Sequence, residues 1–239
     1  MTIQNSASIN HRPSLGLIAR TIAGALVIAA VLFGLLIIPA GTLDWPAAWI
    51  FTIGFLGFLL LYGVWAIRND PSQLRERSTL GTNAKAWDKI ILPLYSLVLI
   101  FLFPVCALDA VRYKATSVPT ALHILGWIAI PLAGGIILWV MRTNTFASRI
   151  ARIQQDRGQT VVSAGPSRYI RHPMYLGIIL LFIGIPLALG SLWSLIPGGL
   201  IGLLFILRTA LEDRMLKIEL PGYREYASRV RYRLIPGIW

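Results

Sequence analysis

Five long apolar runs constrain this chain more than any other feature of its sequence. They cover residues 22–38, 45–67, 90–108, 121–141 and 175–207. The first four have the roughly 17 to 25 residues that a membrane-spanning helix needs. Charged residues make up only 13% of the chain, whereas soluble domains carry about 25%. The sequence therefore predicts an all-α integral membrane protein.

The fifth run is too long for one span and too short for two full ones. Gly184, Pro186, Gly190, Pro197 and the adjacent glycines interrupt it, and such residues are typical of a break between helices. We therefore expect about six transmembrane helices, the last two forming a short helical hairpin, followed by a cytoplasmic helical segment. The first run is longer than the roughly 7 to 15 apolar residues of a secretory signal, so we expect it to be an anchor.

The basic residues are distributed unevenly between the expected loops. Of the 22 Lys and Arg residues, 20 fall on one side of the membrane and two on the other. The positive-inside rule then places both termini in the cytoplasm, in a bacterial inner membrane or, in a eukaryote, the endoplasmic reticulum. The net charge of +12 is explained by contact with anionic membrane lipids, so no nucleic-acid partner is expected.

The chain divides into two regions. Residues 1–140 contain four spans with few polar groups and are predicted to be a scaffold, whereas residues 141–239 concentrate the polar residues. Their basic stretch to Arg157 is expected to be helical. Cys106 is alone and the three histidines lie in different segments, so no metal site is expected. No P-loop, dinucleotide-binding or serine-hydrolase motif is present.

Residues 165–177, GPSRYIRHPMYLG, enter the last apolar run. Pro173 suits the first turn of a helix, which places His172 at the helix start, where unpaired N–H groups favour ligand binding. Charged and aromatic side chains at this depth usually serve a function. Taken singly, Tyr169 and Tyr175 are more typical of interfacial aromatics, and Arg168 and Arg171 of basic flanks, but their combination is not.

A second polar cluster, Arg208, Glu212 and Asp213, follows the last apolar residues. The four-residue step places Arg208 and Glu212 on one face of a helix, and an ordinary surface ion pair is the simplest interpretation of that spacing. The hairpin, however, would bring both residues back beside His172 and Tyr175. We therefore predict a ligand site at this membrane surface.

Together these motifs resemble the isoprenylcysteine carboxyl methyltransferase family and the related membrane phospholipid methyltransferases. The similarity covers roughly residues 150–239: GPxRYxRHPxYxG at 165–177, RxxxED at 208–213, and GYxxYxxxVxxRxxP from Gly222 to Pro236. It implies a membrane enzyme that binds S-adenosylmethionine from the cytoplasm and takes a lipophilic or prenylated acceptor from the bilayer.

The resemblance also implies the site residues. The cofactor contacts would be Gln159, Thr160, Val161, Val162, His172, Pro173, Met174, Tyr175 and Glu212. Arg208 would face the acceptor, and Arg208, Glu212 and His172 would be the catalytic set. Ser167 stands where the family usually has Tyr, and Gln159 where some members have His, so a stacking or hydroxyl contact to the cofactor is lost or altered.

Several functions remain open at this point. A carboxylate acceptor of isoprenylcysteine type needs only a cation such as Arg208, whereas a phospholipid amine needs a proton acceptor, for which Glu212 and His172 are candidates. The expected absence of a second intramembrane acid favours the carboxylate. A sterol-reductase-like enzyme using NADPH is disfavoured by the small size of the chain. A transporter is disfavoured because the first four spans carry few midplane polar residues.

Overall fold

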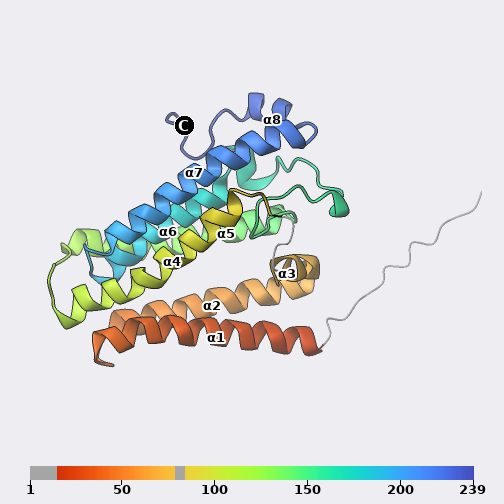
Figure 1. Cartoon of the computed structure of the whole chain (residues 1–239). Helices are drawn as coiled ribbons and strands as arrows, with labels where there is room; N and C mark the ends of the chain where they lie inside the picture. Colours follow the sequence, from red (N-terminus) through yellow and green to blue (C-terminus); the bar gives the residue numbers. More distant parts are fainter. Residues whose placement is uncertain (1–14, 79–83) are drawn as a thin grey trace, which may run out of the picture.

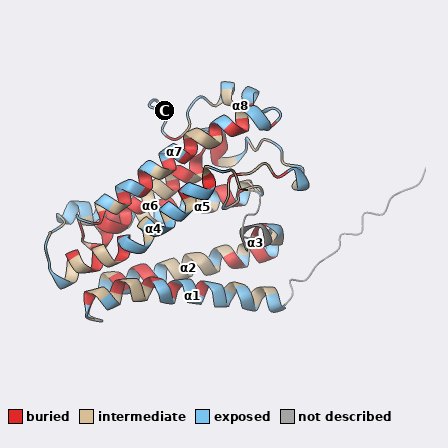
Figure 2. Cartoon of the chain, in the orientation of Figure 1, coloured by how far each residue is buried: buried red, intermediate tan, exposed pale blue. Residues whose placement is uncertain are grey.

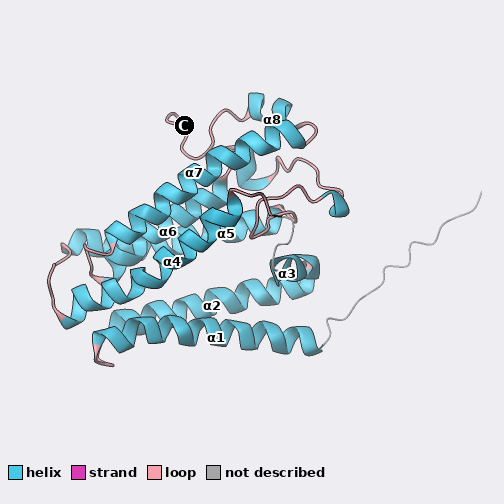
Figure 3. Cartoon of the chain, viewed as in Figure 1, coloured by secondary structure: helices cyan, strands magenta, loops and turns pink. Residues whose placement is uncertain are grey.

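The computed structural model describes residues 15–78 and 84–239. Within these ranges the chain is helical and contains no strand (Figure 3). The elements in chain order are α1 (Leu15–Ala40), α2 (Pro46–Asn69), α3 (Pro71–Ser78), α4 (Asp88–Ala107), the π-helix η1 (Leu108–Arg112), α5 (Thr120–Thr143), the 3₁₀ turns η2 (Gln155–Arg157) and η3 (Gly165–Arg168), α6 (Pro173–Leu189), α7 (Leu195–Glu219) and α8 (Tyr223–Arg229).

Among the described residues, five helices are long and apolar enough to cross a membrane: α1, α2, α4 with η1, α5 and α7. The predicted polytopic helical membrane bundle is thus confirmed. α6 has only 17 residues, or about 25 Å of helix at 1.5 Å per residue. The amino-terminal arm, residues 1–14, lies outside the described residues, so the location of that terminus stays a prediction.

The helical hairpin is present, but only its first helix is short. α7 continues for 25 residues to Glu219. Pro197 falls in its first turn, where no backbone hydrogen bond is lost, so the proline does not interrupt the helix. The expectation of two short helices was therefore wrong for α7.

The helices form one bundle with a helical pair along its side (Figure 1). α1 and α2 pack against each other, and α1 also contacts α4; α6 lies between α5 and α7, and α7 contacts α4. Buried residues concentrate where α4, α6 and α7 meet, whereas the outer faces of α1 and α2 are largely exposed (Figure 2). Large apolar side chains on those faces, such as Val27 and Leu61, suit a lipid environment.

Two glycines shape the α6–α7 hairpin. Gly190 ends α6 with φ +88°, a left-handed conformation that glycine adopts without strain. At Gly198 an added Cβ would lie 2.3 Å from the carbonyl oxygen of Phe182, so only glycine permits the observed approach of the two helices.

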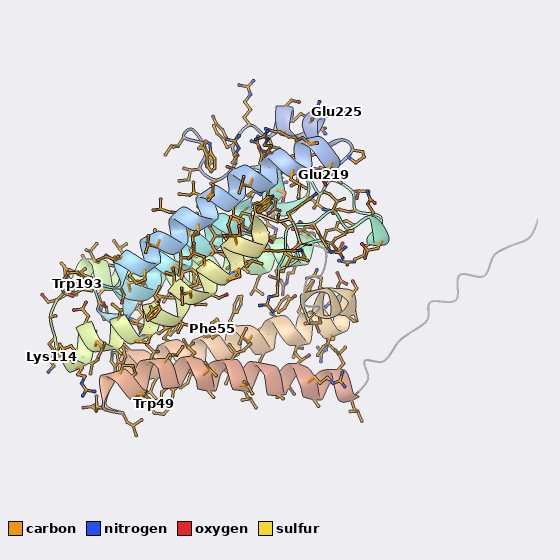
Figure 4. The ribbon with its side chains drawn as sticks, viewed as in Figure 1. Trp49, Phe55, Lys114, Trp193, Glu219 and Glu225 are labelled. Carbon is orange, nitrogen blue, oxygen red and sulfur yellow. The ribbon has the colours of Figure 1, made fainter. Side chains whose placement is uncertain are left out.

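A buried acid fastens the hairpin tip to the end of α4. Oδ2 of Asp109 accepts hydrogen bonds from Oγ of Ser191 at 2.6 Å and from the backbone N–H of Trp193 at 3.1 Å. Trp193 and Lys114 lie at this end of the bundle, and Glu219 and Glu225 lie at the opposite end (Figure 4). Asp109 and Asp88 are both buried. The first 140 residues, which were predicted to be a scaffold poor in polar groups, therefore contain two buried acids.

Candidate active site

The segment at residues 165–177 folds as the sequence predicted. η3 makes the turn, and α6 begins at Pro173 with His172 as its N-cap residue. The backbone N–H groups of Arg171 and His172 donate to the carbonyls of Tyr232 and Arg233, each at 2.9 Å. The carboxy-terminal segment therefore docks on the start of α6 and holds it in place.

A cavity opens beside this helix start, at the end of the bundle where α7 approaches α8. Its empty space is about 850 Å³, including the open mouth. All nine residues predicted to contact the cofactor line it: Gln159, Thr160, Val161, Val162, His172, Pro173, Met174, Tyr175 and Glu212. The structure thus brings the predicted cofactor set together around one space, and Ser167 lines the same space.

Further residues in the cavity wall were not predicted as cofactor contacts. They include Phe146 from the loop after α5, Leu216 and Leu220 near the end of α7, and Tyr223 and Tyr226 from α8. Burial, and then the neighbouring Asp213 carboxylate, raise the pKa of Tyr223 well above its usual range. The two tyrosines fall within the GYxxY motif, which was the available signal, although that motif alone does not say that the rings face a cavity.

The loop between α5 and the Gly165 turn forms the other wall. The basic stretch to Arg157 was expected to be helical, and this was wrong: α5 ends at Thr143 and only Gln155–Arg157 forms a 3₁₀ turn. Oδ1 of Asn144 accepts from the N–H of Phe146 at 2.9 Å, an alternative to helical hydrogen bonding. Oε1 of Gln159 accepts from the N–H of Gln154 at 2.7 Å, so Gln159 also shapes the loop that carries it.

The predicted convergence of an imidazole, a phenol, an anion and a cation is confirmed. The rings of His172 and Tyr175 stack with centroids 5.7 Å apart, and Oη of Tyr175 donates to Oε2 of Glu212. The guanidinium carbon of Arg208 lies 5.3 Å from the Tyr175 ring centroid. By contrast, Tyr169 is 55% exposed, so the interfacial interpretation fits that residue.

Arg208 has a partner that the sequence did not suggest. Its Nε lies 2.9 Å from Oδ1 of Asp88 without hydrogen-bond geometry, and one Nη donates to Oδ2 of the same carboxylate at 3.2 Å. The sequence led us to expect no second intramembrane acid, yet Asp88 is buried at the first residue of a candidate membrane span. Arg208 does not line the cavity; it lies behind Tyr175, and its partner Asp88 comes from the first half of the chain.

Asp213 organises a charged network behind the cavity. Its buried carboxylate contacts Arg171 at 2.7 Å and Lys217 and Arg233 at 3.0 Å, and accepts from Oη of Tyr223 at 3.1 Å. A buried carboxylate is stable only when it is paired and hydrogen-bonded in this way. The sequence allowed Arg171 to be interpreted as a basic flank. In the structure it is a buried partner of Asp213, with 5% of its side chain exposed.

The cavity fits S-adenosylmethionine by the chemistry of its lining. This compound carries a sulfonium cation, and aromatic rings and a nearby carboxylate are groups that stabilise such a cation. Tyr175, Tyr223 and Tyr226 supply rings and Glu212 supplies the carboxylate. Val161, Met174 and Leu216 supply apolar surface, as small-molecule sites require.

Comparison with known proteins adds one finding. Residues 121–219 match the family model described as phospholipid methyltransferase. The match begins in α5, earlier than residue 150, and includes both His172 and Glu212. The matched region is less than half of the chain and indicates a methyltransferase, and the five apolar helices of spanning length fit a membrane protein. A comparison with curated proteins found no match.

Proposed function

We propose that this protein is an integral membrane methyltransferase that uses S-adenosylmethionine to methylate a lipophilic acceptor from the bilayer. One observation carries the proposal: the nine residues implied by the resemblance, from three separate stretches of the chain, line a single cavity. The match to phospholipid methyltransferases supports a methyltransferase over the sterol-reductase-like and transporter alternatives. The cavity and the basic residues around it are proposed to face the cytoplasm, in keeping with the positive-inside rule.

The bound cofactor would supply an electrophilic methyl group, so the protein has mainly to align the acceptor and exclude water. The stacked His172 and Tyr175 rings and the Tyr175–Glu212 hydrogen bond give the cavity a rigid inner wall. Arg208, packed behind Tyr175, lies outside this wall. This arrangement supports a division in which Glu212 and His172 act on the cofactor and Arg208 on the acceptor.

Two acceptor classes fit the site. The carboxylate of an isoprenylcysteine-type substrate is supported by the Arg208 guanidinium. A phospholipid or other lipid amine is supported by the family match and by the Asp88 carboxylate, which already neutralises Arg208. An amine acceptor must also lose a proton, and Glu212, in the cavity wall, is the candidate base.

Cofactor binding is tested by calorimetric titration of the purified protein with S-adenosylhomocysteine. His172→Ala and Glu212→Gln should each weaken binding at least fivefold, because a hydrogen bond involving a charged group contributes about 1.5 to 3 kcal/mol. Glu225→Gln is the matched control, since Glu225 is an exposed acid that does not line the cavity. Unchanged affinity in both cavity variants, with both proteins folded, would refute the cofactor assignment.

The acceptor is tested by transfer of a labelled methyl group to a farnesylated cysteine analogue and, separately, to phosphatidylethanolamine. A carboxyl methyl ester is cleaved by mild base and releases labelled methanol, whereas an N-methyl group is stable under the same treatment. Base-labile product supports the carboxylate and stable product the amine. No transfer to either acceptor by protein that binds S-adenosylhomocysteine would refute both assignments.

A further inference from the structure

A second cleft lies next to the cofactor cavity and has no role in the function proposed above. Its empty space is about 1,090 Å³, including the open mouth. The lining comes from the ends of α2 and α5, the start of α3 and the loop after α5: Trp65, Asn69, Asp70, Ser72, Arg142, Thr145, Phe146 and Arg157. Phe146 also lines the cofactor cavity, so the two spaces share a wall.

The two arginines in this cleft are held differently. Arg157 is fixed: its Nη atoms donate to Oε1 of Gln154 at 2.6 Å and to Oγ of Ser72 at 2.8 Å, and its guanidinium lies 5.5 Å from the Phe146 ring centroid. Arg142 is exposed and makes no side-chain hydrogen bond or ion pair with the residues whose side chains the structure describes, 15–74 and 84–239. One guanidinium is therefore pre-positioned and the other is free to close on a ligand.

Among the residues that line the cleft, the carboxylate is that of Asp70, and it already accepts hydrogen bonds from neighbouring side chains. Asp70 accepts hydrogen bonds from the Ser72 hydroxyl and, at 3.1 Å, from Nε2 of Gln73. Gln73 is 1% exposed and donates from the same nitrogen to the carbonyl of Met141 at 2.9 Å. Asp70 thus helps to fasten α3 to the end of α5, and among the residues that line the cleft no carboxylate pairs with Arg142.

The position of the cleft indicates what kind of anion reaches it. Arg142 lies in the last turn of α5 and Asn69 ends α2, and both helices are long and apolar enough to span a membrane. The ends of such helices lie at the level of the lipid headgroups, where Trp side chains such as Trp65 are enriched. Arginine pairs with phosphate through a planar fork of donors, and the Thr145 hydroxyl adds a further donor.

We propose that this cleft binds the phosphate group of an anionic phospholipid, with Arg157 and Arg142 as its two cationic contacts. A zwitterionic lipid is bound less well, because its own ammonium group offsets the phosphate charge at the same site. Since the Arg157 side chain holds Gln154 and Gln154 holds Gln159, the bound headgroup lies beside the loop that lines the cofactor cavity. The site is independent of which acceptor is methylated.

Lipid binding is measured by native mass spectrometry of the full chain in detergent, titrated with phosphatidylglycerol or phosphatidylcholine. Arg142→Gln should weaken phosphatidylglycerol binding at least fivefold and leave phosphatidylcholine binding within twofold. Arg68→Gln is the matched control, because Arg68 is an exposed arginine in the last turn of α2 that does not line the cleft. It should change neither affinity.

The result that would overturn the proposal is an equal loss of phosphatidylglycerol binding in Arg142→Gln and Arg68→Gln, which would indicate general surface charge. If millimolar inorganic phosphate displaces bound phosphatidylglycerol as effectively as added phosphatidylglycerol does, the proposal is also overturned, because the cleft would then bind a free anion. Thermal unfolding of both variants checks the fold. Arg142→Lys, which keeps the charge but not the fork, should bind phosphatidylglycerol with intermediate affinity.

Discussion

The buried ion pair between Asp88 and Arg208 offers the sharpest test of how Arg208 acts. Asp88 is 0% and Arg208 4% exposed. Removing one partner leaves a buried charge without its counterion, which costs about 3 to 5 kcal/mol. Since about 1 kcal/mol shifts the melting temperature of a chain of this length by roughly 2 to 4 °C, Asp88→Asn and Arg208→Gln should each lower it by on the order of 10 °C.

The double variant, Asp88→Asn with Arg208→Gln, separates the effect of the ion pair on stability from any effect of Arg208 on turnover. The asparagine amide would keep an oxygen for the N–H of Ala151, which now donates to Asp88 at 2.6 Å. The glutamine amide would keep a donor for the carbonyl of Arg149, which now accepts from Arg208 at 2.9 Å. A neutral pair leaves no uncompensated charge, so the double variant should recover at least half of the lost stability.

An exposed ion pair serves as the control for this cycle. Nζ of Lys85 lies 2.7 Å from Oε1 of Glu219, and both side chains are about a third exposed or more. Surface pairs contribute about 0 to 1 kcal/mol, so Lys85→Gln and Glu219→Gln should change the melting temperature little, singly or together.

The decisive readout is turnover of a stable protein. If Arg208 holds a carboxylate acceptor, the double variant regains stability and binds S-adenosylhomocysteine as the wild type does, while kcat/KM for that acceptor stays at least tenfold low, about 1.4 kcal/mol of transition-state stabilisation. Wild-type kcat/KM in the double variant would refute a role on the acceptor. A double variant no more stable than either single variant would refute the energetic coupling of the pair.

Two further predictions concern packing and pH. Gly198→Ala should destabilise the protein by more than about 1 kcal/mol, because its Cβ would meet the Phe182 carbonyl at 2.3 Å. Gly199→Ala, with open space around it, should be neutral or slightly stabilising in thermal unfolding. Equal effects of the two substitutions would refute the packing argument. Burial raises the pKa of Tyr226 to about 12 from 10.0, so the folded state holds this proton more tightly than the unfolded state. The resulting stability is complete below about pH 10 and is lost as the pH rises towards about 12; Tyr226→Phe should flatten this part of the melting-temperature profile, and an unchanged profile would contradict it.

The nine residues proposed to contact the cofactor were implied by the family resemblance, and most of them lie in two short stretches of sequence, 159–162 and 172–175. Thr160 and His172 are each adjacent in the sequence to other residues of this set. Once the position of each stretch is known, the positions of its side chains follow. The Asp88–Arg208 pair was not predictable in this way. Its members are 120 residues apart, and hydropathy identifies spans without saying which spans are neighbours.

Other differences arise because one composition is compatible with two structures. Arg171 has the charge expected of a basic flank, and only its contact with Asp213 shows that it is internal. The basic stretch after α5 contains good helix formers, but the side chain of Asn144 bonds the backbone two residues on and the helix ends there. Side-chain hydrogen bonds of this kind compete with helix propensity, and a count of helix-forming residues does not include them.

The Asp88–Arg208 pair also bears on the order in which the protein is made. α4 begins at Asp88, and Arg208 belongs to α7, 120 residues later. At about 5 to 20 residues per second, the ribosome needs roughly 6 to 24 s to synthesise that interval. During it, the nascent α4 carries a carboxylate without its permanent counterion, at the helix end where water and lipid headgroups can solvate it. The Asp88–Arg208 pair can therefore form only after α7 has been synthesised, which makes assembly of this part of the site a late step in biogenesis.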